Sequence, residues 1–167
     1  MSLAHTTTEL LDLRPVQLPE VVSSLERKQI AQVTIADLSK CPAYPHGLYV
    51  IFGPPPEAEC YYVGAAASRS FVERVPSHFD DREHAWMNTL PKKMKKKHRG
   101  MSLSEAVDLS LQCYIMLLSM KKGKSKKKLS RLETIFRYAL APKYNAQDKR
   151  PKWLDDSKTL KQMLAEI

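Results

Sequence analysis

A chain of 167 residues has room for one domain with short extensions, and a hydrophobic fraction of 43% is enough to give that domain a core. Its formal net charge of +9 indicates an acidic partner, most simply a nucleic acid, although such a charge can also merely keep a protein in solution. No stretch approaches the roughly 20 apolar residues of a membrane span, and three scattered cysteines without a Cys-x-x-Cys pair argue against a disulfide framework and a structural zinc.

The first 45 residues are predicted to form an N-terminal helical arm that packs on the main domain. Residues 19–32 are typical of a helix, because Pro19 suits a first turn. An apolar stripe runs through this segment, formed by Val21, Val22, Leu25, Ile30 and Ala31. Pro42 and Pro45 then indicate a loop that leads into the next element.

Two short apolar runs, at residues 48–52 and 60–63, predict an antiparallel hairpin with a proline-rich loop between its strands. A hairpin alone is marginal, so a third strand is needed. Strict alternation of apolar residues predicts that strand at residues 109–119. A helix from Leu103 onward is the competing interpretation, because Ser102 and Glu105 resemble a capping box.

Three helical segments complete the predicted fold. Residues 68–90 are expected to be largely helical, with a kink at Pro76 or two helices that meet near Val75. Residues 129–140 carry a helical apolar stripe that Pro142 ends, and residues 155–167 predict a short terminal helix. The sequence therefore predicts an α+β fold: a small three-stranded antiparallel sheet flanked by helices.

The predicted chain has three parts: an arm at residues 1–45, a central domain at 46–147 with a lysine-rich insertion at about 91–128, and a C-terminal tail or helix at 148–167. Two runs, residues 91–99 and 121–131, carry 13 of the 27 basic side chains. Such runs usually bind phosphates without reading bases, and the alternative is a solvated loop. The candidate DNA-binding residues are Lys92, Lys93, Lys95, Lys96, Lys97, Lys126, Lys127 and Lys128.

Two tyrosine motifs stand out from the rest of the chain. Gly47-Leu48-Tyr49 is followed, with twelve residues between the tyrosines, by Tyr62-Val63-Gly64. Downstream lie an arginine, a histidine, a glutamate and an asparagine, namely Arg74, His78, Glu133 and Asn145. Two tyrosines, an arginine, a histidine and one carboxylate are side chains suited to phosphodiester hydrolysis.

In this order and spacing the motifs resemble the GIY-YIG nuclease family over about residues 47–145. The resemblance implies the three-stranded fold and a divalent-metal-dependent DNA endonuclease that leaves a 5'-phosphate and a 3'-hydroxyl. Leucine and valine replace the isoleucines of the family name, and the stretch between His78 and Glu133 is long. Pro76 also interrupts the i, i+4 relation between Arg74 and His78.

The resemblance also assigns a role to each residue of the set. Glu133 is expected to hold a single Mg²⁺ or Mn²⁺ ion, with waters and phosphate oxygens completing its shell. Arg74 is expected to stabilise the charge that develops on the phosphate, and Tyr49 to act as general base or as a relay to the water. Tyr62 then orients the water or phosphate, His78 assists Tyr49 or contacts phosphate, and Asn145 braces the site.

Each role has a structural alternative. Glu133 can form a capping box with Ser130, and Arg74 can pair with Asp80 or Asp81. The tyrosines can simply fill the core. Because neighbouring strand residues alternate, Tyr61 is expected on the face opposite Tyr62.

The preferred functional hypothesis is a restriction or defence nuclease that acts on double-stranded DNA. The alternatives are a structure-specific repair or recombination nuclease, and a non-catalytic nucleic-acid-binding module on the same fold. Cutting both strands of a palindrome suggests a homodimer on DNA, and a partner protein that supplies specificity is the other option. We expect no membrane partner and a cytoplasmic protein, nuclear in a eukaryote.

Overall fold

The computed structural model describes residues 3–166 with the exception of residues 57, 81, 83, 85–88, 122–125 and 147–148. Helices and strands are interspersed along the chain, so the fold is mixed α+β as expected. Among the helices described, none is both long and apolar enough to cross a membrane.

Among the described residues the sheet has five strands in place of the three expected. Its centre is antiparallel and consists of β4 (Cys60–Ala66), β3 (Gly47–Phe52) and β5 (Tyr114–Ser119), with β3 in the middle. Two further strands, β1 (Ala4–Thr6) and β2 (Lys28–Gln29), pair with the outer edge of β5, parallel and antiparallel respectively. The prediction of a purely antiparallel three-stranded sheet is therefore wrong, because the N-terminal segment completes the sheet.

The helix predicted at residues 19–32 is shorter than expected. Helix α1 spans Leu18–Ser24, after which Leu25 turns to an extended conformation. The chain then joins the sheet through β2, and the Ile30 amide donates a hydrogen bond to the Cys113 carbonyl over 2.8 Å. Pairing with β5 therefore outweighs the local helical pattern in this segment, and α2 (Ile35–Ser39) follows it.

The segment predicted as a third strand is half helix and half strand. Helix α5 (Leu103–Gln112) begins at a capping box in which Ser102 and Glu105 cap each other, as the competing interpretation expected. Its buried residues recur at helical spacing: Leu103, Ala106, Val107 and Ser110. The strand prediction is confirmed only for β5, and the alternation of apolar residues over 109–113 does not correspond to a strand.

Of the remaining helices, α6 lies near its predicted position. The described part of the segment 68–90 is less helical than predicted, the terminal helix is shorter than predicted, and α4 was not predicted as a helix. Helix α3 (Phe71–Arg74) meets a 3₁₀ turn (Pro76–Phe79) at Val75, which is one of the two arrangements expected around Pro76. Helix α4 (Thr89–Lys97) carries the first lysine run, and α6 (Lys126–Leu140) begins with the second. The terminal helix α7 spans Leu160–Ala165.

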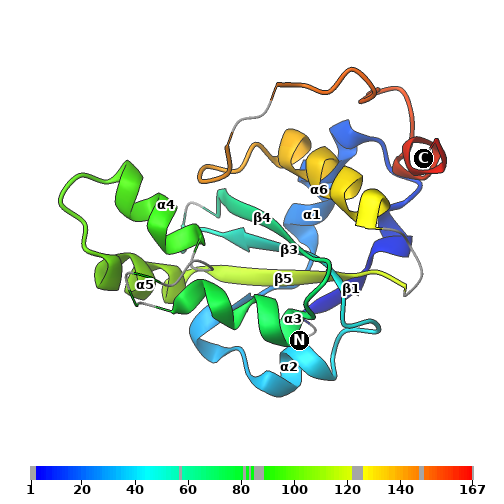
Figure 1. The fold of residues 1–167 in the computed structure, drawn as a ribbon. Coiled ribbons are helices and arrows are strands. Elements are labelled where there is room, and N and C mark those ends of the chain that lie inside the picture. Colours follow the sequence, from blue (N-terminus) through cyan, green and yellow to red (C-terminus); the bar gives the residue numbers. More distant parts are fainter. Residues whose placement is uncertain are drawn as a thin grey trace.

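Helices cover both faces of the sheet, with α1 and α6 on one side and α2 and α3 on the other (Figure 1). Residues of β3 contribute alternately to the two cores: Leu48, Val50 and Phe52 to the core under α1, α6 and α7, and Tyr49 and Ile51 to the core under α3, α4 and α5. All six residues of β3 are buried. The first tyrosine motif therefore lies in the middle of the molecule.

Candidate active site

The centre of the candidate site is a contact between Tyr49 and His78. Neither side chain has exposed surface, and the Tyr49 hydroxyl lies 2.6 Å from Nε2 of His78. The Leu90 amide at the start of α4 donates a longer hydrogen bond, of 3.4 Å, to Nδ1 of the same ring. A ring that accepts at Nδ1 carries its proton on Nε2, so His78 donates to the Tyr49 oxygen.

Pro76 does not remove His78 from this contact. It occupies the first position of the 3₁₀ turn, where a missing amide proton costs little. The turn directs the His78 ring inward, and the His78 amide donates to the Val75 carbonyl over 3.1 Å. The interrupted spacing between Arg74 and His78 is therefore a change of helix type at Val75.

Gly64 leaves room for the Tyr49 ring. The two residues are paired across β3 and β4, and a Cβ atom at Gly64 would overlap Cζ and Oη of Tyr49. Gly47 is similarly close to β5, because a Cβ there would overlap the Leu118 carbonyl oxygen. The glycines of both motifs are thus required by close packing around β3, a reason that the sequence analysis missed.

Tyr62 completes a cluster of three rings. Its ring centroid lies 6.2 Å from that of Tyr49 in a stacked arrangement and 5.2 Å from that of His78 in an edge-on one. The prediction that Tyr61 faces the other side is wrong, because Ile51 pairs with Tyr62 while Phe52 pairs with Cys60. The resulting bulge puts Tyr61 in the same core as Tyr62.

The charged side chains near the cluster change the pKa values of Tyr49 and His78. Burial raises the pKa of Tyr49 well above its ordinary value; Tyr62 and Glu133 raise it further, whereas the charge and a hydrogen bond of Arg74 lower it. Burial, followed by the charges of Arg74 and Lys93, lowers the pKa of His78 to about 3. Arg74 and Glu133 therefore lie near enough to Tyr49, and Arg74 and Lys93 near enough to His78, for their charges to act on these groups.

The structural alternative for Glu133 is wrong. Helix α6 begins at Lys126, so Ser130 lies inside the helix and its carbonyl accepts a hydrogen bond from the Thr134 hydroxyl. Glu133 is half-buried in the second turn and cannot cap the helix start. Its charge raises the pKa of Tyr49, after burial, Tyr62 and Arg74 among the causes.

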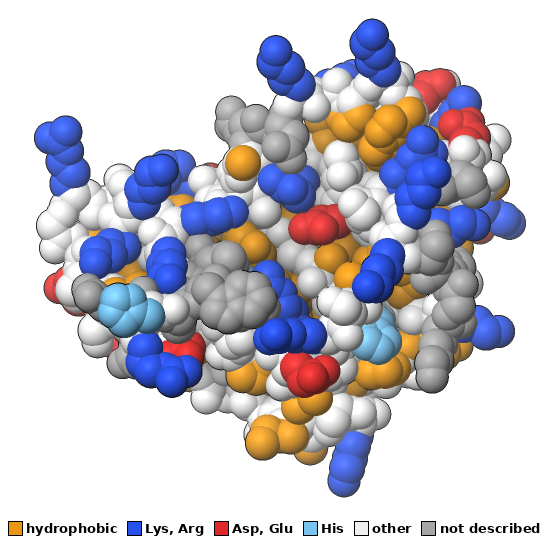
Figure 2. Space-filling view, viewed as in Figure 1, with side chains coloured by type: hydrophobic (Ala, Val, Ile, Leu, Met, Phe, Trp, Pro, Cys, Tyr) orange, Lys and Arg blue, Asp and Glu red, His pale blue; other side chains and the backbone are white. Residues whose placement is uncertain are grey.

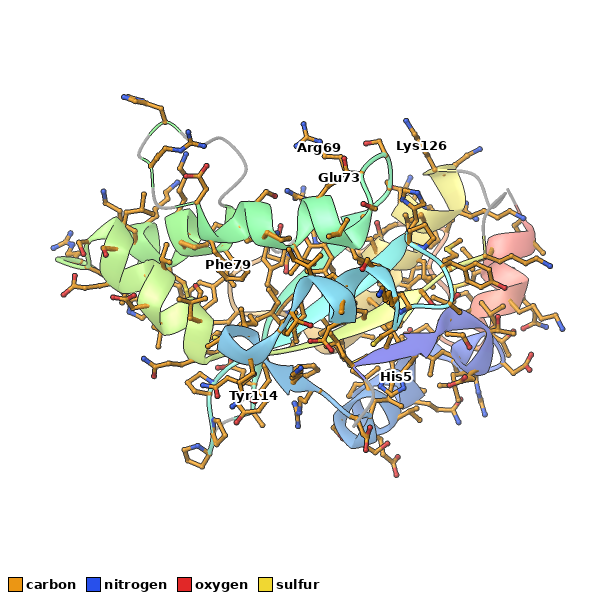
Figure 3. The ribbon with its side chains drawn as sticks, turned by 90° about the horizontal axis from the view of Figure 1, so that it is seen from below. His5, Arg69, Glu73, Phe79, Tyr114 and Lys126 are labelled. Carbon is orange, nitrogen blue, oxygen red and sulfur yellow. The ribbon has the colours of Figure 1, made fainter. Side chains whose placement is uncertain are left out.

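The carboxylates near Arg74 in the sequence have other contacts. Asp80 accepts a hydrogen bond of 2.8 Å from Nε of Arg82, and Asp81 lies outside the described residues. Glu73 caps α3, because its carboxylate accepts from the Ser70 amide and hydroxyl. Figure 3 shows Glu73 and Arg69 on the outer side of this helix.

Asn145 braces the strand that carries the second motif. Its side-chain oxygen accepts from the Val63 amide over 2.7 Å, and its side-chain nitrogen donates to the Val63 carbonyl over 2.9 Å. The backbone amides of Lys143 and Tyr144 donate to the carbonyls of Cys60 and Tyr61. Residues 143–145 therefore line the outer edge of β4 like a short extra strand, and Asn145 has a structural role in the site.

The first lysine run is helical and not a solvated loop. Leu90 and Met94 of α4 are fully buried, which fixes the orientation of the helix. Lys92 and Lys93 are half-buried, whereas Lys95, Lys96 and Lys97 are exposed. In the second run Lys126 and Lys127 are exposed and Lys128 is half-buried, and residues 122–125 lie outside the described chain. Figure 2 shows Lys and Arg side chains over both α4 and α6.

Lys93 is predicted from the sequence only as one of eight candidate DNA-binding lysines, and the structure places it at the ring cluster. Its ammonium nitrogen lies 5.2 Å from the centroid of the Tyr62 ring, and its charge acts on His78. It stands among five lysines within six positions, so no spacing distinguishes it from its neighbours. Only the rotation of α4 identifies it.

Within the described chain, no three His, Cys, Asp or Glu side chains gather into a ready-made metal site. Glu133 supplies a carboxylate, and a carboxylate with waters and phosphate oxygens is a usual shell for Mg²⁺. Glu133 could therefore contribute one ligand to a hard divalent cation. Searches of protein-family models, curated proteins and solved structures found no match to this chain.

Proposed function

We propose that this chain is a divalent-metal-dependent DNA endonuclease of the GIY-YIG type, which hydrolyses phosphodiester bonds to 5'-phosphate and 3'-hydroxyl ends. The observation that carries the proposal is the convergence of separate segments on one tyrosine. His78 contacts the Tyr49 hydroxyl over 2.6 Å, and Arg74 and Glu133 act on the same hydroxyl from α3 and α6. A tyrosine that only filled the core would not need a histidine, an arginine and a glutamate around its hydroxyl.

In this mechanism Tyr49 first loses its own proton to solvent and then, as the phenolate, accepts the proton of the attacking water. Burial keeps its pKa high, so the hydroxyl is protonated in the free protein and works as a base only when cations stabilise its anion. Arg74 supplies one such cation and opposes the effect of burial. Neutral His78 donates to the Tyr49 oxygen, and this contact stabilises the anion as it forms.

The other residues position the phosphate. Arg74 stabilises the charge that develops on its oxygens, and the Tyr62 ring fixes the water or phosphate beside Tyr49. Glu133 would hold one Mg²⁺ or Mn²⁺ ion, which supplies Lewis acidity toward the phosphate. Asn145 keeps β4 in place through both polar groups of Val63. A restriction or defence enzyme acting on duplex DNA is the favoured assignment within this class.

A non-catalytic nucleic-acid-binding module is the second candidate. The observation that favours it is the raised pKa of Tyr49, because a protonated, fully buried tyrosine is a poor base without further cations. The same fold and the same lysines then serve binding alone. A structure-specific repair or recombination nuclease uses the site as the first proposal does and differs in its substrate.

Cleavage assays with matched carboxylate variants separate these candidates. Wild type, Glu133→Gln and Glu105→Gln are incubated with supercoiled plasmid, duplex, branched and single-stranded DNA in Mg²⁺ or Mn²⁺. We expect Glu133→Gln to cut at least ~100-fold more slowly, because it loses the charge that holds the ion. Glu105→Gln should cut like wild type, since glutamine also completes the capping box of α5.

The pattern of products decides the assignment. Fixed plasmid bands indicate a sequence-specific enzyme, and cuts confined to junctions or flaps indicate a structure-specific one. If wild type binds all these DNAs tightly and cuts none of them with either metal, the enzyme proposal fails and the binding module remains.

A further inference from the structure

A row of lysine ammonium groups lies against tyrosine rings beside the candidate site. Lys93 lies 5.2 Å from the centroid of Tyr62, Lys97 lies 5.4 Å from that of Tyr144, and Lys143 lies 5.1 Å from that of Tyr61. Ammonium groups held over aromatic rings are attracted by the ring faces and lose part of their freedom. These lysines are therefore more fixed than lysines that extend into solvent.

The row follows from the orientation of α4. The fully buried Leu90 and Met94 set which flank of the helix faces β4. Lys93 and Lys97 are one turn apart on that flank, and Nζ of Lys97 also donates to the Lys143 carbonyl over 3.1 Å. Lys95, Lys96 and Lys97 are all exposed, but of these three only Lys97 has its ammonium over a tyrosine ring. Helix α4 thus carries two lysines held over tyrosine rings, Lys93 and Lys97, and two that extend into solvent, Lys95 and Lys96.

The row extends from the site towards Glu59. It begins at Lys93, which lies over the site residue Tyr62 and acts on His78. It continues past Lys97 to Lys143, whose ammonium pairs with Glu59 over 3.1 Å. A carboxylate at that end repels a phosphate, so the row can serve only a short length of backbone.

We propose that Lys93 and Lys97 form a track for the sugar-phosphate backbone of the cleaved DNA strand, on one side of the scissile bond. The inference rests on the proposed function and specifies its substrate contacts. Four helical residues advance about 6 Å, which is of the order of the step between neighbouring phosphates of one strand. Lys93 binds the phosphate nearest the site and Lys97 binds the next one.

Lys93 and Lys97 of the track differ from Lys95 and Lys96 in what they contribute to DNA binding. Lys95 and Lys96 contribute general attraction that does not depend on any one phosphate. Lys93 and Lys97 hold particular phosphates and so fix the position of the strand relative to Tyr49. Removing the charge of a single phosphate should therefore affect the contribution of Lys93 and Lys97 but not that of Lys95 and Lys96.

The test uses a duplex with one mapped cleavage site and a single uncharged methylphosphonate placed, in turn, at each nearby position of the cleaved strand. We compare kcat/KM for wild type, Lys93→Ala/Lys97→Ala and the matched pair Lys95→Ala/Lys96→Ala. In wild type, kcat/KM should fall about tenfold at one or two positions on one side of the site. Lys93→Ala/Lys97→Ala should lose this position dependence, whereas Lys95→Ala/Lys96→Ala should keep it and bind all substrates more weakly.

Two results would overturn the track: equal sensitivity on both sides of the site, or the same positional profile in both double variants. Circular dichroism checks that the variants fold, and Lys93→Arg/Lys97→Arg should restore the positional profile because it keeps both cations. If wild type cleaves no DNA, the proposed function fails by itself. The track is then tested by the dissociation constants of short duplexes that carry one methylphosphonate at successive positions of a chosen strand, measured at low salt for wild type and for both double variants.

Discussion

His78 is a neutral imidazole enclosed by the protein, and its environment opposes protonation of the ring while it holds the ring against Tyr49. Burial and two cations, Arg74 and Lys93, oppose its protonation and lower its pKa from 6.5 to about 3. The hydrogen bond to Tyr49 compensates by satisfying Nε2 in the neutral form. A neutral ring can stay beside Arg74 without repulsion, which keeps both groups close to the Tyr49 hydroxyl.

This environment makes stability depend on pH. Below about pH 6.5 the unfolded chain binds a proton at His78 that the folded protein does not accept until about pH 3. The free energy of unfolding should therefore fall as pH decreases through this window, with a contribution from His78 of about 2 kcal/mol at pH 5. Urea unfolding at pH 7.5, 6 and 5 measures it.

Two variants isolate the contribution of His78. His78→Gln should be less stable at pH 7.5 but should change less between pH 6.5 and 5, because it has no imidazole to protonate. His98→Gln removes a histidine at the end of α4 and should keep the wild-type slope. Arg82 lowers the pKa of Asp80 to about 2, so that carboxylate affects stability mainly below this window. Equal slopes in wild type and His78→Gln would contradict the prediction.

At the scale of elements, the position of β4 depends on the segment that follows α6. An unpaired strand edge exposes backbone groups, and residues 143–145 cover this edge next to the site. Asn145 forms two hydrogen bonds to the same residue, Val63, in the centre of the second tyrosine motif. The asparagine thereby links the end of α6 to the strand that carries Tyr62.

Removal of this link should loosen β4. Asn145→Ala loses both hydrogen bonds to Val63, and we expect a loss of about 1–2 kcal/mol in the free energy of unfolding. Amide hydrogen exchange at Val63 should become faster than in wild type. Lys143→Ala keeps the backbone hydrogen bond to Cys60 and should leave exchange at Val63 nearly unchanged. Unaltered exchange in Asn145→Ala would mean that the backbone bonds alone hold the edge.

The sequence predicted the elements whose local pattern agrees with their final environment. The hairpin of β3 and β4 has strand formers on both sides of a proline-rich loop, and α6 has an uninterrupted apolar stripe. Residues 109–113 fit alternation and helical spacing equally, and the cap at Ser102 favours the helix. The two-residue strand β2 has no recognisable sequence pattern, because the strand forms only through its pairing with β5.

The site was predictable in its residue types but not in its geometry. The tyrosine motifs and the later histidine and glutamate could be read from order and spacing. The bulge that turns Tyr61 to the same side as Tyr62 depends on pairing between two strands, which the sequence does not encode locally. The role of Lys93 depends on the rotation of α4, which the buried Leu90 and Met94 determine.

At the scale of the whole molecule, the N-terminal segment is part of the sheet and of both cores. Strands β1 and β2 share the outer edge of β5, the first along residues 117–119 and the second along residues 114–115. Leu10, Leu18 and Val22 lie in the core under α6, whereas Leu3 lies in the core around Tyr49. The central part of the chain therefore relies on residues that the sequence analysis assigned to an arm.

Deletion of residues 1–45 should consequently prevent cooperative folding. The deletion exposes the outer edge of β5 together with apolar surface on both faces of the sheet. We expect aggregation in size-exclusion chromatography and no sharp thermal transition by circular dichroism. As a control, Val16→Ser/Ile35→Ser changes two exposed apolar residues of the same segment and should fold like wild type. A truncated chain that melts cooperatively would contradict this prediction.

The covered sheet edges also restrict how two copies of the chain can assemble. Residues 143–145 occupy the edge of β4, and the opposite edge ends in strands of three and two residues, too short to pair firmly with another chain. Two copies are therefore not expected to join their sheets into one continuous sheet across a two-fold axis. A pair that cut opposite strands would meet through helices and loops, or would be held together by the DNA that both copies bind.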